Sequence, residues 1–156
     1  MSEGKNFMDN TIASTYYASV VDNQDQALVH LFFHCCLEDD RFTEPEMEDL
    51  SAKLVLLGIP PKMNIKEELI GYRHYKPSIT DEQVYIRYLF GLIKPVNELA
   101  LYSYCVELVI DDQFLDAREE TLLARIAEEL ELEKDEAATI NRLTAQRKAV
   151  EIQKIF

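Results

Sequence analysis

The chain has 156 residues, of which 47% are hydrophobic, and this is enough material for one hydrophobic core of ordinary size. Only four glycines and five prolines are present, so the composition lacks the turn residues of an all-β fold and favours helices. The formal net charge of −13 excludes ready binding to nucleic acid or to an anionic membrane surface, and it favours cations or basic partners.

The N-terminal residues and the length of the apolar runs indicate the cellular location of the protein. The N-terminal residues are polar, and no apolar run approaches the ~20 residues that span a bilayer. We expect residues 1–10 to be flexible, and residues 11–156 to form a single all-helical domain that does not insert into a membrane. Three cysteines without CxxC spacing indicate a reducing compartment, which predicts a cytoplasmic protein.

The first predicted elements are a short docking helix over residues 12–21, which contains Tyr16 and Tyr17, and a longer helix from Gln24. In the longer helix, apolar residues recur with the i, i+3, i+4, i+7 spacing of a helix that turns one face to the core. The residues of this stripe are Leu28, Leu31, Phe32 and Cys35. An equivalent stripe returns 73 positions later, as Leu101, Tyr104, Cys105 and Leu108.

Each stripe leads into an acidic segment, and the two segments share one pattern. The first runs from Asp39 to Glu46 and the second from Asp112 to Glu119, again 73 positions apart. Both contain an Asp, an apolar residue, a Thr or Asp, and a Glu at the same spacing. The last two are three residues apart, which is the spacing of a capping box at the start of a helix. The repeat therefore predicts two helix-loop-helix units.

Further helices are predicted from other capping signatures. Asn64 and Thr80 each precede a Glu or Gln by three residues and predict helices over 65–75 and 81–93. Residues 134–155 are predicted as one long helix or two short ones. The complete prediction is an all-α fold of about seven or eight helices, in which a helical pair separates two pseudo-repeated helix-loop-helix units.

The acidic loops are candidates for a cation site. Two loops that faced each other would bring four carboxylates together, and hard divalent cations prefer such oxygen ligands. The candidate ligands are Asp39, Glu46, Asp112 and Glu119. Alternatively, the glutamates serve only as capping residues and the aspartates only end a helix. A further alternative is a metal-independent interaction module, in which the acidic loops or Tyr16 and Tyr17 bind a basic or apolar protein partner.

Other chemistries have weaker support in the sequence. His30 and His34 have the i, i+4 spacing that can chelate zinc, but no HExxH motif accompanies them. The four glycines form no phosphate-binding loop, and no GxSxG nucleophile motif is present. An enzyme that uses a cysteine nucleophile, or paired carboxylates as acid and base, is the third alternative and lacks a supporting motif. The sequence thus predicts a non-enzymatic domain.

The duplicated motif resembles that of the tellurite-resistance TerB-like family, whose two helix-loop-helix halves each carry Ala-Asp-Gly-x-Ile/Leu-Ser/Asp-x-x-Glu. The matching segments are 38–46 and 111–119, and the similarity covers roughly residues 24–145. Asp40 and Gln113 replace the motif glycine, and glutamine tolerates a left-handed backbone poorly. The resemblance implies a link to tellurite or stress resistance and a Ca²⁺ or Mg²⁺ site. Its ligands would be Asp39, Glu46, Asp112 and Glu119.

Overall fold

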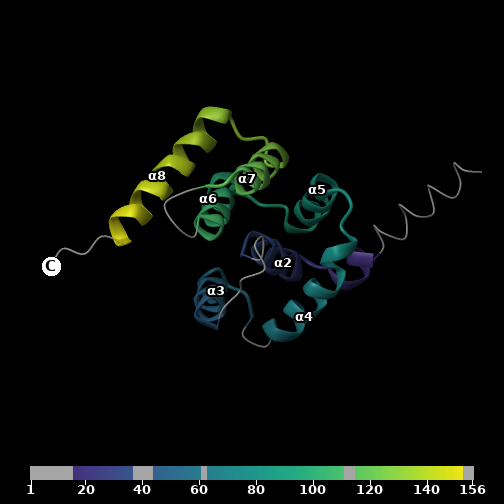
Figure 1. Cartoon of the computed structure of the whole chain (residues 1–156). Helices are drawn as coiled ribbons and strands as arrows, with labels where there is room; N and C mark the ends of the chain where they lie inside the picture. Colours follow the sequence, from purple (N-terminus) through teal and green to yellow (C-terminus); the bar gives the residue numbers. More distant parts are fainter. Residues whose placement is uncertain (1–15, 37–43, 61–62, 111–114, 153–156) are drawn as a thin grey trace, which may run out of the picture. The chain divides into compact units, whose positions relative to one another are not determined.

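The structure, a computed structural model, describes most of the chain (Figure 1). The described residues are 16–36, 44–60, 63–110 and 115–152. Within these ranges 16–20 are helical and every other regular element is also a helix, which confirms the predicted all-α class. The labelled helices are α2 (Gln24–Cys36), α3 (Glu44–Leu56), α4 (Ile65–Tyr75), η1 (Lys76–Ser78, a 3₁₀ turn), α5 (Glu82–Ile93), α6 (Glu98–Val109), α7 (Ala117–Glu129) and α8 (Lys134–Ile152).

The backbone contacts divide these elements into two compact units. The first unit contains the helical residues 16–20, most of α2, and the helices from α3 to α5. The second unit contains the last residues of α2 and the helices α6, α7 and α8. No helix in the described part of the chain is long and apolar enough to cross a membrane.

The helix boundaries agree with the register of the predicted repeat. Helices α3 and α7 both have 13 residues, and α7 begins and ends 73 positions after α3. Helix α6 likewise ends 73 positions after α2. Leu50 and Leu123, which correspond at this offset, are both 1% exposed. The duplication stays a prediction, and the positions of the helices are consistent with it.

Capping side chains explain where two of the central helices begin. The side chain of Asn64 accepts a hydrogen bond from the backbone N–H of Glu67, as the sequence predicts. The expectation for Thr80 is wrong, because Asp81 is the N-cap of α5 and accepts the N–H of Val84. A carboxylate is the better cap here, since its charge also complements the positive end of the helix dipole.

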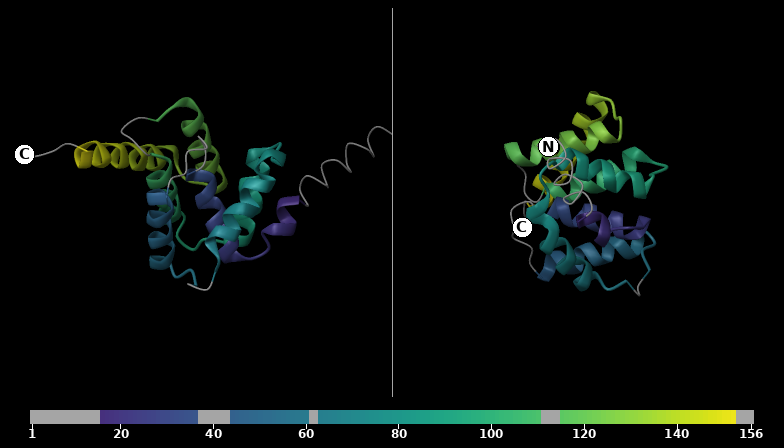
Figure 2. Two further views of the ribbon diagram at one scale, coloured as in Figure 1. Left: turned by 60° about the horizontal axis from the view of Figure 1, so that its bottom comes forward. Right: turned by 90° about the vertical axis from the view of Figure 1, so that its right-hand side faces the viewer.

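Helix α2 is buried on more than one face. Within the first unit, α3, α4 and α5 lie around it (Figures 1 and 2). Of the predicted apolar stripe, only Leu28 is half-buried and the other three residues are buried. Val29 and Phe33, which lie outside that stripe, have no exposed surface either. The prediction of one core-facing stripe therefore understates how much of this helix is covered.

An aromatic cluster holds the helical residues 16–20 in the first unit. The ring of Tyr17 lies edge-on to those of Tyr85 and Tyr88, with centroid distances of 5.0 and 5.3 Å. Tyr17 is 5% exposed, and the hydroxyl of Tyr88 donates to the carbonyl of Val21 at 2.6 Å. Since Tyr17 is committed to the core of its own chain, it is not a surface side chain for a protein partner.

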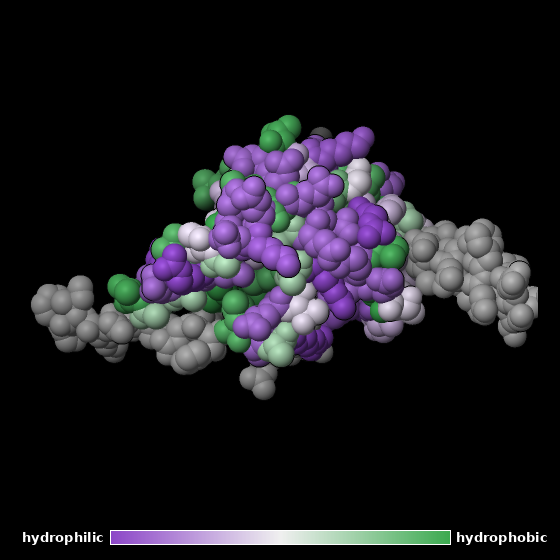
Figure 3. All heavy atoms as spheres, turned by 90° about the horizontal axis from the view of Figure 1, so that it is seen from above, coloured by the Kyte–Doolittle hydropathy of each residue, from purple (hydrophilic) through white to green (hydrophobic). Residues whose placement is uncertain are grey.

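In the second unit, α6 packs against both α7 and α8. Tyr102, Cys105 and Val106 of α6 are buried, as are Leu123 and Ile126 of α7. Outside the core, hydrophilic residues predominate on the face of the molecule drawn in Figure 3, with hydrophobic residues scattered between them. This surface fits the high content of charged residues.

Two neighbouring cations of α8 interact with the end of α6. The ammonium group of Lys148 donates to the backbone carbonyls of Glu107 and Ile110. The guanidinium of Arg147 pairs with the carboxylates of Glu107 and Glu151. Because the last carbonyls of a helix have no partner within the helix, Lys148 supplies the donor that the C-terminus of α6 lacks.

Candidate functional site

The predicted cation ligands lie mostly outside the described part of the structure. Asp39 and Asp112 belong to the ranges that are not described, and so does the side chain of Glu46. Of the four, Glu119 is the one whose side chain is described, and it lies in the first turn of α7. Among the described residues, no group of three or more His, Cys, Asp or Glu side chains is placed to hold a metal ion.

Glu119 is part of a complete capping box. Its backbone N–H donates to Oδ1 of Asp116 at 2.7 Å, and its Oε1 accepts the backbone N–H of Asp116 at 3.2 Å. This confirms the capping role that the sequence predicts for the pair. The carboxylate of Glu119 therefore has a structural task at the start of α7.

Replacing Asp116 with alanine should lower the free energy of unfolding by about 1 kcal/mol, because the amide of Glu119 loses its acceptor. Urea denaturation followed by far-ultraviolet circular dichroism measures this change. Asp116→Asn is the matched control, since asparagine caps a helix about as well as aspartate. Equal losses in the two variants would show that the charge of Asp116 matters and the hydrogen bond does not.

His30 does not have the surroundings of a zinc ligand. Its ring is fully buried, its Nε2 lies 2.8 Å from Oε1 of Glu68, and its Nδ1 lies 2.7 Å from the hydroxyl of Tyr75. The rings of His30 and Tyr75 are stacked, with an interplanar angle of 10°. Zinc needs an imidazole nitrogen with an available lone pair. Both nitrogens of His30 are engaged, so the zinc interpretation of His30 with His34 finds no support.

The hydrogen bonds continue from His30 into the core. The hydroxyl of Tyr75 lies 2.6 Å from that of Tyr85, and Glu68 also accepts from Nε2 of Gln26 at 3.2 Å. We call Glu68, His30, Tyr75 and Tyr85 the His30 network. Only Glu68 reaches the surface, where 18% of its side chain is exposed. In the described structure no buried side-chain nitrogen or oxygen lacks a partner, as a stable polar core requires.

Burial shifts the pKa values of this network. It raises the pKa of Tyr85 well above its ordinary value and also raises that of Tyr75. It lowers the pKa of His30, although the hydrogen bond and the charge of Glu68 oppose the shift. The tyrosines are therefore neutral and His30 is favoured as the neutral imidazole, which donates from Nε2 to Glu68 and accepts at Nδ1 from Tyr75.

The stability of the protein should therefore fall in acid through His30. Its folded pKa lies below the unfolded value of 6.5, so the unfolded chain binds more protons in the interval between the two. The contribution is complete above pH 6.5 and decreases as the pH falls toward the folded pKa. Midpoints of urea denaturation, measured between pH 8 and pH 5, give the slope of stability against pH. His30→Gln should flatten it relative to His74→Gln, in which the exposed histidine is changed; parallel slopes would contradict the assignment.

Two of the three cysteines considered as nucleophiles, Cys35 and Cys105, are poorly placed for that role. Cys35 and Cys105 are buried, whereas Cys36 is half-buried. A reactive cysteine needs both access to substrate and a group that stabilises the thiolate. Burial denies the first requirement to Cys35 and Cys105.

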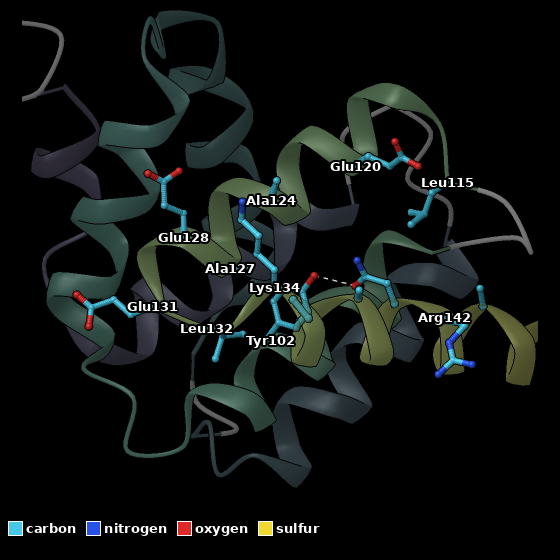
Figure 4. Close-up of a pocket in the computed structure, with 14 residues that line it drawn as sticks. Tyr102, Leu115, Glu120, Ala124, Ala127, Glu128, Glu131, Leu132, Lys134 and Arg142 are labelled. Carbon is cyan, nitrogen blue, oxygen red and sulfur yellow. Dashed lines mark hydrogen bonds between the residues drawn. The ribbon is translucent and has the colours of Figure 1, made fainter.

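The second unit contains a large groove, with a volume of about 1170 Å³, between α7 and α8 over α6 (Figure 4). Its floor includes the hydrogen bond from the hydroxyl of Tyr102 to Oδ1 of Asn141, at 2.7 Å. Most of the other lining side chains are apolar, and five of these seven are the small side chains of alanine: Leu115, Ala124, Ala127, Leu132, Ala137, Ala138 and Ala145. We call this feature the α7–α8 groove. It combines an apolar lining with one neutral polar pair.

The turn between α7 and α8 sets up the groove. Glu131 has a positive φ of 56°, and the N–H groups of Glu131 and Leu132 donate to the carbonyls of Glu128 and Ala127. This is the Schellman arrangement that ends a helix sharply. It lets α8 begin at Lys134, so that both helices pack on α6 while their alanines leave the space between them open.

Charged residues lie at the edges of the α7–α8 groove. The exposed acidic ones, Glu120, Glu128 and Glu131, come from α7 and the turn after it. The exposed basic ones, Lys134 and Arg142, come from α8. Among the residues that line the groove there is no cysteine, histidine or serine. The groove therefore offers an apolar surface with charged margins for a bound molecule.

Burial raises the pKa of Tyr102 to about 12, and its hydrogen bond to Asn141 opposes part of that shift. The floor of the groove is thus uncharged at neutral pH. None of the groove residues was singled out in the sequence as a site, because alanines in a helix have no distinguishing pattern.

Comparisons of the chain with protein families, with curated proteins and with solved structures found no match. The TerB-like resemblance stays a prediction from the duplicated motif. The site itself is therefore the basis for assigning a function.

Proposed function

We propose that this protein is a non-enzymatic interaction domain, which binds a segment of another protein in the α7–α8 groove without a metal. The supporting observation is the groove itself, whose volume of about 1170 Å³ exceeds the roughly 300–1,000 Å³ of small-molecule sites. The apolar lining supplies favourable burial, and the charged edges orient the bound segment. This is the metal-independent alternative that the sequence also allows.

The size of the groove limits the affinity. A single groove between two helices buries less surface than the roughly 1,200–2,000 Å² of a standard stable interface. We therefore expect reversible binding, with a dissociation constant on the order of micromolar, as in transient signalling contacts. Small lining residues such as Ala124 and Ala138 favour a partner that contributes the large side chains.

Selection from a random library of displayed 16-residue peptides tests the proposal without assuming the form of the partner. Peptides that bind the protein should be enriched, and they should fail to bind Ala138→Trp, in which an indole fills the groove. Gln146→Trp is the matched control, because Gln146 is an exposed residue of α8 outside the groove lining. Enrichment that is equal on all three proteins, or no enrichment, would refute the proposal.

A second candidate function is the binding of Ca²⁺ or Mg²⁺ by the acidic loops, favoured by the duplicated motif and its TerB-like resemblance. Calorimetric titration of the purified protein with each ion should then release or absorb heat. The variant Asp39→Asn/Asp112→Asn should show none, because amides are weaker ligands for hard cations. The absence of heat with the parent protein would reject the site and, with it, the support for a role of this kind in tellurite resistance.

A further inference from the structure

We propose that the segment bound in the α7–α8 groove is an amphipathic α-helix of about three turns, with one basic edge and one acidic edge. This inference rests on the proposed interaction function and specifies its partner. Three features of the groove carry it: its length, the size of its lining side chains, and the opposite charges of its two edges.

The length of the groove matches a short helix. Its lining residues on α8 extend from Lys134 to Ala145, and those of α7 and the following turn extend from Glu120 to Glu131. At 1.5 Å per residue, the span on α8 is about 16–17 Å long. A helix of about 11 residues fills that length, whereas an extended strand would place only about five residues in it.

The lining suits the large apolar side chains of a helix. Ala124 and Ala138 are exposed, and Ala127 and Ala145 are half-buried, so small side chains occupy both walls. Helices pack with their side chains in the spaces between those of their neighbours, at axial distances of about 8–10 Å. Walls of alanine permit this close approach when the incoming helix carries leucine, phenylalanine or methionine at three- and four-residue spacing.

The charges exclude other occupants and set the edges of the helix. Glu120 and Glu128 belong to α7 and Arg142 to the middle of α8, whereas Glu131 and Lys134 lie at the turn that joins the two helices. An occupant with one sign of charge on both edges is repelled at one wall. An acyl chain offers no charges to the walls, and a polyanion is repelled by the net charge of −13.

The test uses three designed helices of about 14 residues, each held helical by a side-chain staple and labelled for fluorescence anisotropy. They share one leucine face and differ in their edges: one basic and one acidic, both basic, or both acidic. The mixed peptide matches the charges of both walls in one of its two directions along the groove, so it should bind the parent at least about tenfold more tightly than the all-acidic peptide. Ala138→Trp should abolish binding, and Gln146→Trp should not.

The decisive variant is Arg142→Glu, which makes the α8 edge acidic near the middle of the groove. It should shift the preference from the mixed peptide toward the all-basic peptide by about tenfold relative to the parent. Glu136→Lys is the control, because Glu136 is exposed on α8 but does not line the groove. An unchanged preference in Arg142→Glu would overturn the assignment of the edges.

The remaining outcomes separate this inference from the proposed function. If no stapled helix binds while the random library yields groove-dependent peptides, the interaction function stands and the helical partner is refuted. If neither binds, both are refuted. If the parent associates with itself in sedimentation and Ala138→Trp does not, the occupant is a second copy of this chain, and the inference of a separate partner is overturned.

Discussion

Replacing His30 with alanine is expected to lower the free energy of unfolding by about 3–5 kcal/mol. The imidazole is fully buried, so its removal leaves a cavity of aromatic size. It also removes the partner of Glu68 and of the Tyr75 hydroxyl, and an unsatisfied buried polar group costs about 1–3 kcal/mol more. Since the free energy of unfolding of a domain is only about 5–15 kcal/mol, this single change should remove a large part of the stability.

Urea denaturation at pH 8, where His30 is neutral, measures this loss without a contribution from its titration. His74→Ala is the control and should cost less than about 1 kcal/mol, because His74 is exposed. Tyr75→Phe, which keeps the ring and removes only the hydroxyl, should cost about 1–3 kcal/mol. If His30→Ala and His74→Ala had similar effects, the His30 network would have no special part in stability.

The second large effect is expected at Lys148. Changing it to methionine keeps the apolar stem and removes the ammonium group that donates to the carbonyls of Glu107 and Ile110. Hydrogen bonds from a charged group contribute about 1.5–3 kcal/mol, so the free energy of unfolding should fall by about that amount. The end of α6 should fray, which hydrogen exchange of its last turn would detect.

Arg147 provides the comparison, because it is the next residue in the chain and carries the same charge. Its side chain is 51% exposed, and both of its partners are carboxylates. Exposed ion pairs contribute about 0–1 kcal/mol, so Arg147→Met should have a much smaller effect than Lys148→Met. Equal effects would mean that net charge, and not the backbone contacts of Lys148, determines the result.

Local signals account for the features that the sequence predicted correctly. The helix over 65–75 follows from its Asn64 cap, the helix predicted over 81–93 is present although its cap is Asp81 in place of Thr80, and the box of Asp116 and Glu119 depends on residues three positions apart. Such contacts form within one turn of helix, so the type and spacing of the residues suffice to predict them.

The features that were missed depend on packing between distant segments. His30 contacts Glu68 and Tyr75, which are 38 and 45 residues away in the sequence. The spacing of His30 and His34 does not predict these partners. The i, i+4 spacing of the two histidines is compatible with zinc only when their helix is viewed in isolation, without the residues that pack against it. The α7–α8 groove depends on the small side chains of residues such as Ala124 and Ala138. Alanine is equally common in helix faces that are covered by another helix, so its presence does not predict a groove.

The capping box at the start of α7 has a consequence for any ion at the acidic loops. A bidentate glutamate gives both carboxylate oxygens to Ca²⁺, and Oε1 of Glu119 already accepts the amide of Asp116. Ion and amide would compete for the same oxygen. Occupancy by Ca²⁺ would therefore weaken one half of the capping box, while Oδ1 of Asp116 would still accept the N–H of Glu119, so the ion would replace one bond of the cap and leave the helix start in place.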